Sequence, residues 1–207
     1  MRRPSSYTHS DKGFTLVELL VVIMVLTILL AVVAPTLYPD GGPKLEGSTS
    51  LLVSEISAAQ QLALRDKSPT ELRLYSFDPP SRQALVSRAY RAYQTFRRNE
   101  EGQFVVHSNF TTLEDPIIIL SDSQFSSIAD LESQEAGDDF PLDTRARYVA
   151  FRFNGDGSTN LPKSSSDNWF ITLASETSYS AEGSLPPDFI TLQIDPVNGR
   201  VRTFRPE

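Results

Sequence analysis

A single carboxylate, that of Glu18, stands at the start of a long apolar segment. Residues 19–34 contain only one polar side chain, that of Thr27. An ionised acid inside an apolar membrane helix costs about 2.5 to 3.5 kcal/mol on insertion scales. The chemistry open to Glu18 is therefore that of an ion pair, and we expect it to have a cationic partner.

The segment that carries Glu18 has the length of a membrane span. Residues 14–34 form a helix of roughly 31 Å at a rise of about 1.5 Å per residue, close to a hydrocarbon core about 30 Å thick. Arg2, Arg3 and Lys12 precede it, and the positive-inside rule keeps that end in the cytoplasm. We therefore expect a single-pass helix, with everything after Pro35 exported.

Simpler explanations of this segment account for less of it. A secretory signal has an apolar region of about 7 to 15 residues; Val32-Val33-Ala34 is a passable cleavage site, but the segment is longer and Pro35 follows directly. A plain membrane anchor explains the length but not Glu18. A buried core helix explains neither the uninterrupted apolarity nor the basic leader.

The basic leader, Gly13, Phe14, Glu18 and the apolar helix together resemble the type IV prepilin and pseudopilin superfamily. The resemblance implies that a prepilin peptidase cuts after Gly13 and methylates the new amino terminus at Phe14. One helical turn separates Phe14 from Glu18, so the amine and the carboxylate share a helix face. The resemblance also implies that Glu18 pairs with the terminal amine of a neighbouring pilin or pseudopilin subunit during filament assembly.

The chain divides into four predicted parts. Residues 1–13 are the leader, 14–38 the transmembrane and assembly helix, 39–47 a flexible neck and 48–207 a globular head. The neck is predicted because residues 39–43 contain two prolines and two glycines, which disfavour a continuous helix.

The composition limits what the head can be. The chain has a formal net charge of −7 and no cysteine, and loss of the leader, with three basic residues and one acid, leaves −9. An acidic protein is not drawn nonspecifically to phosphate polymers or anionic lipid. Without disulfides the head depends on its core, and about 160 residues are enough for one domain.

The head is predicted to begin with a helix. It starts near Ser48 to Ser50, extends toward Arg65 and ends at residues 66–69, where Pro69 restricts the residue before it. An apolar stripe at helical spacing predicts packing on a sheet. The stripe consists of Leu52, Ile56, Ala59 and Ala63, widened by Leu51 and Leu62.

Short runs rich in β-branched and aromatic residues predict an antiparallel sheet after Pro69. The predicted strands are 70–77, 84–96, 103–107, 116–120, 147–153, 169–174, 189–195 and 200–205. Residues 195–199 include Asn-Gly and join the last two strands as a tight hairpin. The acidic, serine-rich residues 121–143 are predicted to be loop. The fold class is therefore α+β, a pilin-like arrangement of an N-terminal transmembrane helix and a second helix packed on an antiparallel sheet.

The head also resembles known families, more diffusely than the N-terminus does. Residues 151–158, 169–173 and 190–202, with the passage 60–75, resemble minor pseudopilins of the GspH/FimT type. Residues 60–75, 90–96 and 194–206 are still more similar to the Verru_Chthon cassette protein D family, which has no defined role.

The sequence offers little for catalysis or metal binding. Only two histidines exist, His9 in the leader and His107 in a predicted strand, so no Ser-His-Asp arrangement is apparent. Residues 154–160 alternate oxygen-bearing side chains across two glycines, faintly like a calcium loop. They lack the later bidentate glutamate of an EF-hand, and Asn-Gly-Asp-Gly is typical of an ordinary turn. We therefore expect no metal and no cofactor.

DNA binding is the functional alternative that the head resemblance implies, because FimT-like minor pilins engage DNA through arginines near the C-terminus. Arg200, Arg202 and Arg205 occupy that region, and Arg200 and Arg202 share a strand face. A second basic group comprises Arg88, Arg91, Arg97 and Arg98. The simpler interpretation is that strand arginines keep a sheet edge soluble, which the acidic net charge favours.

The sequence thus predicts a minor pilin or pseudopilin, a structural subunit of a type II secretion or type IV pilus-like filament, in the bacterial inner membrane with its head outside the cytoplasm. Two alternatives remain: a DNA-binding minor pilin for DNA uptake, and a membrane-anchored extracytoplasmic enzyme.

Overall fold

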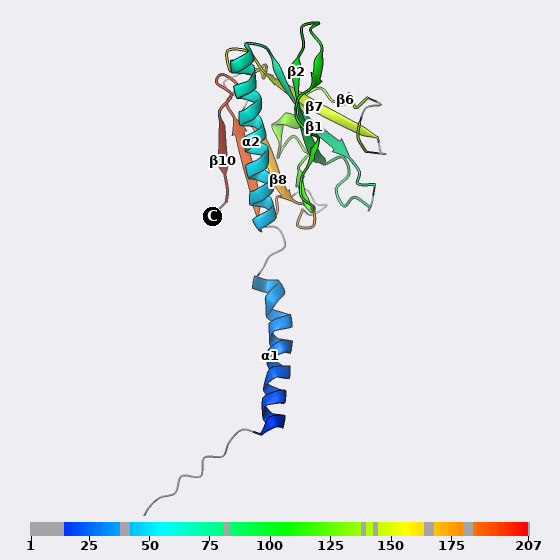
Figure 1. Cartoon of the computed structure of the whole chain (residues 1–207), viewed down its shortest axis with the longest axis vertical. Coiled ribbons are helices and arrows are strands. Elements are labelled where there is room, and N and C mark those ends of the chain that lie inside the picture. Colours follow the sequence, from blue (N-terminus) through cyan, green and yellow to red (C-terminus); the bar gives the residue numbers. More distant parts are fainter. Residues whose placement is uncertain are drawn as a thin grey trace, which may run out of the picture. The chain divides into compact units, whose positions relative to one another are not determined.

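The computed structural model describes residues 15–37, 42–80, 83–137, 140–142, 145–163, 168–179 and 184–206. The chain forms two compact units, residues 1–40 and residues 41–207 (Figure 1). We call the second unit the head. Gly13 and Phe14, where processing is predicted, lie outside the described residues.

The first unit contains one helix, α1 (Leu16–Leu37), which includes Pro35. Every described side chain from Thr15 to Leu29 is exposed. The hydroxyl of Thr27 donates hydrogen bonds to the carbonyls of Ile23 and Met24 at 3.0 and 2.8 Å, so this polar group is satisfied within the helix. Within the described residues no helix is both long and apolar enough to cross a membrane. The single-pass helix therefore stays a prediction.

The second helix, α2 (Gly42–Asp66), begins earlier than the sequence suggests. Residues 42–47 were predicted to be part of a flexible neck, and this is wrong because they are helical. Pro43 lies in the first turn, where a missing N–H costs nothing. The Leu45 side chain is only 1% exposed, and the Lys44 amine donates to the Asp115 carbonyl at 3.0 Å. Contacts with the head thus hold a turn that its own sequence disfavours.

The buried face of α2 is the predicted stripe, with one error. Leu52, Ile56 and Ala63 are fully buried, and Ala59 and Leu62 nearly so. Leu51 was predicted to widen the stripe, but it is 61% exposed, because one residue turns the side chain about 100° around the helix. The helix ends as predicted before Pro69, and Lys67 there has a φ of 51°.

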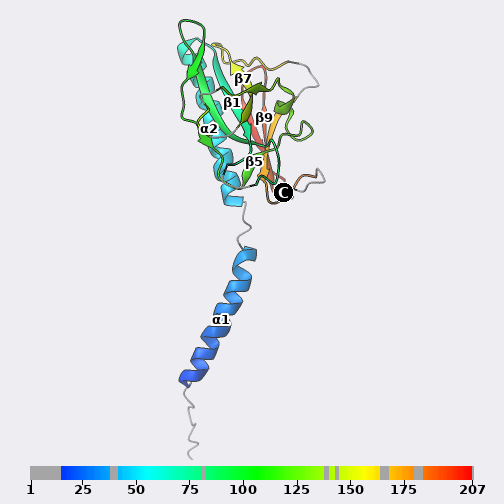
Figure 2. The ribbon, with the colours of Figure 1, turned by 90° about the vertical axis from the view of Figure 1, so that its right-hand side faces the viewer.

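One antiparallel sheet forms the rest of the head (Figure 2). Its strand order is β10-β9-β8-β5-β2-β1-β7-β6, and β3 and β4 also pair with β2. β1 (Thr70–Phe77) pairs along its length with both β2 (Tyr90–Arg98) and β7 (Ala146–Phe153). The remaining elements are β3 (Phe104–Val106), β4 (Thr111–Thr112), β5 (Ile117–Ile119), the 3-10 helix η1 (Ser127–Asp130), β6 (Gln134–Glu135), β8 (Trp169–Ser175), β9 (Phe189–Ile194) and β10 (Val201–Phe204).

The predicted α+β fold class is confirmed, and two segment predictions are wrong. Residues 84–89 are not part of β2 but form a loop, in which Arg88 has a φ of 61°. Residues 121–143 are not simply loop, since they contain η1 and β6. Ile128 of η1 is fully buried in the core, which a serine-rich, acidic composition does not reveal.

The main core lies between α2 and one face of the sheet. α2 contributes Leu45, Leu52, Ile56, Ala59 and Ala63 to it. The strands contribute Leu72, Leu74, Val149, Phe151, Phe153, Ile171, Leu173, Leu192 and Ile194, among others. The opposite face of β1 carries a smaller aromatic cluster around Tyr75 and Phe77. β1 is therefore buried on both faces and paired along both edges.

Gly199 closes the core where the end of α2 meets the β9–β10 turn. The Gln60 amide donates to the carbonyls of Gly157 and Asn198 at 2.9 and 2.6 Å. Gly199 has a φ of 67°, and a Cβ atom there would lie 2.5 Å from Gln60 Nε2 and 2.8 Å from Phe153 Cε1. Both the left-handed backbone and the close approach therefore require glycine.

We expect Gly199→Ala to lower the free energy of unfolding of the full-length chain in detergent by about 2 to 4 kcal/mol, from left-handed strain and overpacking. Gly47→Ala is the matched control, since Gly47 is helical and a Cβ there meets nothing within 4 Å. It should stabilise by about 0.5 to 1 kcal/mol. Urea unfolding of both variants measures this, and equal effects would contradict the role assigned to Gly199.

Two core tyrosines make the head sensitive to alkaline pH. Burial raises the pKa of Tyr90 to about 12 and the pKa of Tyr93 to about 12. Both folded-state values lie above the ordinary value of about 10, so the stability that the neutral phenols contribute is full below pH 10 and is lost as the pH rises toward 12. Urea midpoints should fall over that window, and Tyr90→Phe/Tyr93→Phe should flatten the fall; a parent midpoint independent of pH there would refute the assignment.

Candidate functional site

The amino end of α1 contains a reciprocal cap formed by Thr15 and Glu18. The Glu18 carboxylate accepts hydrogen bonds from the Thr15 backbone N–H and hydroxyl, both at 3.1 Å. The Glu18 N–H in turn donates to the Thr15 hydroxyl at 3.2 Å. This is a capping box, which satisfies backbone donors that a helix start otherwise leaves free. The Thr-x-x-Glu spacing was visible in the sequence, and sequence reasoning missed it.

The Glu18 carboxylate makes no ion pair with any described residue. The neighbouring side chains of Leu16, Val17 and Leu19 are apolar and exposed. A helix that is apolar on all sides is one that becomes buried, in a membrane or against other helices. The partner predicted for Glu18, the Phe14 amine of another subunit, lies outside the described residues. The ion pair therefore stays a prediction.

The C-terminal arginines do not converge on one site. Arg205 forms ion pairs with Glu46 of α2 and, at 3.1 Å, with Asp188. These two acids, Asp188 first, raise the pKa of Arg205 and offset its charge. Arg200 and Arg202 are exposed near the β9–β10 turn. DNA binding by these arginines stays a prediction. One of the three side chains, that of Arg205, is already paired with acids of the head.

The second basic group is also divided, because Arg91 is buried. Its guanidinium bonds the Glu176 carboxylate at 2.5 and 3.2 Å and the Phe77 and Val86 carbonyls at 3.1 and 3.0 Å. The Glu176 side chain is fully buried and also accepts the N–H groups of Leu85 and Val86. This network satisfies a buried ion pair and fixes the loop before β2. Arg91 is therefore unavailable to DNA.

Residues 154–160 form a turn that packs on the end of α2. The Asp156 carboxylate accepts the Ser158 N–H and hydroxyl at 2.9 and 2.7 Å, and these bonds lower the pKa of Asp156. A Cβ atom at Gly155 would lie 2.6 Å from the Lys67 carbonyl carbon. The described residues contain no group of three or more His, Cys, Asp or Glu able to hold a metal. The glycines of this motif thus have a packing role.

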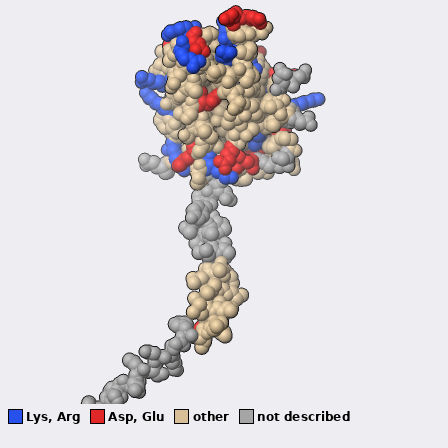
Figure 3. Space-filling model, viewed as in Figure 1, with Lys and Arg blue, Asp and Glu red and all other residues tan. Residues whose placement is uncertain are grey.

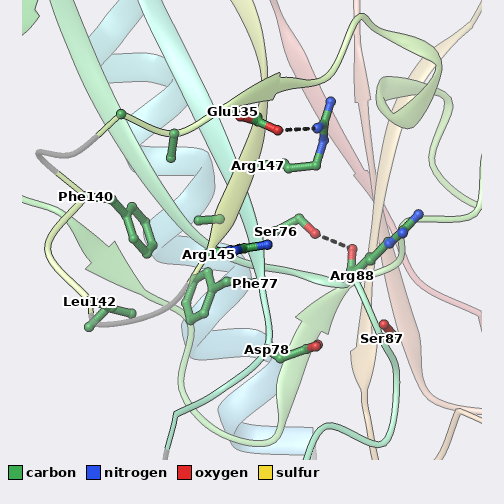
Figure 4. Close-up of a pocket in the computed structure, with 13 residues that line it drawn as sticks. Ser76, Phe77, Asp78, Ser87, Arg88, Glu135, Phe140, Leu142, Arg145 and Arg147 are labelled. Atoms are coloured by element: carbon green, nitrogen blue, oxygen red, sulfur yellow. Dashed lines mark hydrogen bonds and ion pairs between the residues drawn. The ribbon is translucent and has the colours of Figure 1, made fainter.

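A hollow of about 950 Å³ lies where β1 and β7 meet the loop before β2 (Figure 4). Its lining is mostly polar and includes three arginines, Arg88, Arg145 and Arg147, with Glu135 and Ser76. No local motif predicts this hollow, because its lining residues come from separate segments of the chain. His107 does not line it. The hollow suits an anionic group rather than nucleophilic catalysis.

Comparison with known proteins identifies the amino end. Residues 8–34 match the family described as "Prokaryotic N-terminal methylation motif". The match confirms that the chain carries such a motif, and the roles of Gly13, Phe14 and Glu18 stay predictions. The chain is similar to the crystal structure of the type IV minor pilin FimU of Pseudomonas aeruginosa, with 10% identity and a TM-score of 0.44 over 80% of this chain and 94% of that chain. No curated protein matches it.

Proposed function

We propose that this protein is a minor pilin or pseudopilin, a structural subunit of a type II secretion or type IV pilus-like filament. The observation that carries the proposal is the match of residues 8–34 to the N-terminal methylation motif. The position of Glu18 in the first turn of the apolar helix α1 supports it. The α+β head, with α2 on an antiparallel sheet, is compatible with this role. The proposal assigns the protein assembly rather than turnover.

The proposed pathway begins in the inner membrane. The leader stays in the cytoplasm, residues 14–38 cross the bilayer and the head lies outside the cytoplasm. Prepilin peptidase cuts after Gly13 and methylates Phe14, which creates a cationic amine at the start of the helix. The membrane location is supported by the apolarity of the sequence through Ala34, which continues beyond the last described side chain of the helix.

The proposed assembly step uses the exchange of hydrogen-bond partners at Glu18. In the single chain, Thr15 satisfies the carboxylate locally. A neighbour's amine supplies a full opposite charge, and the low dielectric of packed apolar helices strengthens that attraction. The other described side chains of α1, residues 16–29, are exposed and apolar apart from Thr27, and in the filament they pack against other helices. The charge pair sets the subunit's register, and apolar burial supplies the bulk of the contact.

The state of the mature amino terminus tests the proposal directly. Mass spectrometry of the protein purified from membranes of a host with prepilin peptidase should give a first residue Phe14 carrying one added methyl group. In a host without that peptidase the chain should retain Met1. Retention of the leader in a functional exported protein would rule out the proposed pathway.

Substitution of Glu18 tests the assembly step separately. Glu18→Ala should leave membrane insertion and cleavage intact, but reduce recovery in sheared filaments about 100-fold, because an amine left unpaired among apolar helices costs about 3 kcal/mol or more.

Thr27→Ala is the matched control on the same helix, since the Thr27 hydroxyl bonds only to carbonyls of its own helix. It should assemble at the parent level. Parent-level recovery of Glu18→Ala would contradict the role proposed for the carboxylate.

A further inference from the structure

The arginine hollow is lined by three arginines and two acids, Asp78 and Glu135, which leaves one net positive charge in its lining. Arg147 is paired with Glu135 at 3.5 Å and bonds the Ser133 carbonyl and hydroxyl. Within the described residues the guanidinium groups of Arg88 and Arg145 have no hydrogen-bond or ion-pair partner. Figure 4 shows Arg145 directed toward Ser76 and Phe77 within the hollow. Two exposed guanidinium groups thus remain for an external anion.

The wall that carries Arg88 is held rigidly in an unfavourable conformation. Arg88 has a φ of 61°, a left-handed backbone that non-glycine residues rarely adopt. Ser76 donates its hydroxyl to the Arg88 carbonyl at 2.7 Å, and Glu176 binds two N–H groups of the same loop, with Arg91 bonding its Val86 carbonyl. Strain maintained by so many contacts is typical of a binding surface.

An unpaired acidic turn projects from the other end of the same strands. Glu100 and Glu101 stand between β2 and β3, are exposed and make no ion pair within the described part of the head. The turn is itself ordered: the Gln103 N–H donates to Asn99 Oδ1 at 2.8 Å and the Arg98 guanidinium to the Gly102 carbonyl at 3.1 Å. Figure 1 shows this turn beyond β2 at the top of the head, and Figure 3, in the same view, shows acidic residues at that end of the head.

The two features cannot meet within one molecule. β1 pairs with β2 from Thr70 opposite Arg97 to Ser76 opposite Tyr90, so the acidic turn and the hollow lie at opposite ends of this pair. Six residue steps of a strand span about 20 Å. Their charges are therefore available only to another molecule.

We propose that the Glu100–Glu101 turn of one copy docks in the arginine hollow of a second copy, with its carboxylates on Arg88 and Arg145. This inference rests on the proposed filament function. A turn of four residues is small enough for a hollow of about 950 Å³, and guanidinium–carboxylate pairing gives the contact direction as well as attraction. Since donor and acceptor surfaces differ, the contact is heterologous and can repeat from copy to copy, as a subunit of the proposed filament requires.

The absence of cysteine from the chain permits a clean cross-linking test. Two differently tagged full-length copies are produced together in membranes, one with Ser87→Cys in the lining of the hollow and the other with Gln103→Cys, an exposed position next to the turn that keeps both glutamates. Oxidation should give a disulfide-linked heterodimer on a non-reducing gel. Its yield should fall as salt screens the exposed charges.

Charge reversal identifies the groups responsible. Arg145→Glu in the first copy, or Glu100→Arg in the second, should each lower the heterodimer yield about fivefold, as loss of an exposed ion pair and a new repulsion predict. Both reversals together should restore it. Ser87→Cys with Val197→Cys is the matched control, since Val197 is an exposed turn residue without an acidic charge, and should give only background.

Each outcome decides the inference. Heterodimer that is insensitive to both reversals, or a yield equal to that of the Val197 pair, would overturn the docking of this turn in this hollow. Correct processing at Phe14 and Glu18-dependent assembly under the same conditions would leave the proposed filament function standing. Loss of those two properties in the parent chain would instead remove the filament function itself.

Discussion

The packing of α2 on one face of the sheet is the contact on which the head depends. With no cysteine in the chain, no disulfide limits the unfolded state, so stability comes from apolar burial along this face. Leu52, Ile56 and Ala63 are fully buried there. β1 joins this core to the aromatic cluster on the other face of the sheet. It is paired along both edges and carries core residues on both faces.

Polar contacts set the two ends of α2 rather than its middle. At the start of the helix, the Lys44 amine donates to the Asp115 carbonyl and the Glu46 carboxylate pairs with Arg205. These contacts extend the helix into a region of unfavourable local sequence. Toward its end, the Gln60 amide donates to the carbonyls of Gly157 and Asn198 and so joins the turn at residues 154–160 to the β9–β10 hairpin. The Asn-Gly motifs of the head, at residues 154–155 and 198–199, thereby acquire a packing explanation. Arg205, one of the three arginines predicted to bind DNA, pairs with Glu46 of the same helix.

The head and α1 use charge in opposite ways. Glu18 is one acid on an apolar helix, satisfied only by its neighbour Thr15, and it gains most from a cation brought by another chain. The head is acidic overall, yet within its described residues Arg88 and Arg145 line one hollow without an ion-pair partner, and Glu100 and Glu101 stand without one on one turn. The head therefore has charged groups open to other molecules at two separate places, the arginine hollow and the acidic turn. Such an arrangement is what the proposed repeated association requires.

Local patterns in the sequence predict the amino-terminal motif, the α+β class and seven of the eight strands to within about two residues. Apolar periodicity and Asn-Gly turn chemistry are signals of this local kind. Tertiary contacts decide three features that local patterns did not predict. They are the start of α2 at Gly42, the exposure of Leu51 and the burial of Ile128. Each depends on which groups from distant segments lie opposite, and local propensity is weak beside such contacts. For the same reason the arginine hollow, assembled from three segments, had no signature in the chain.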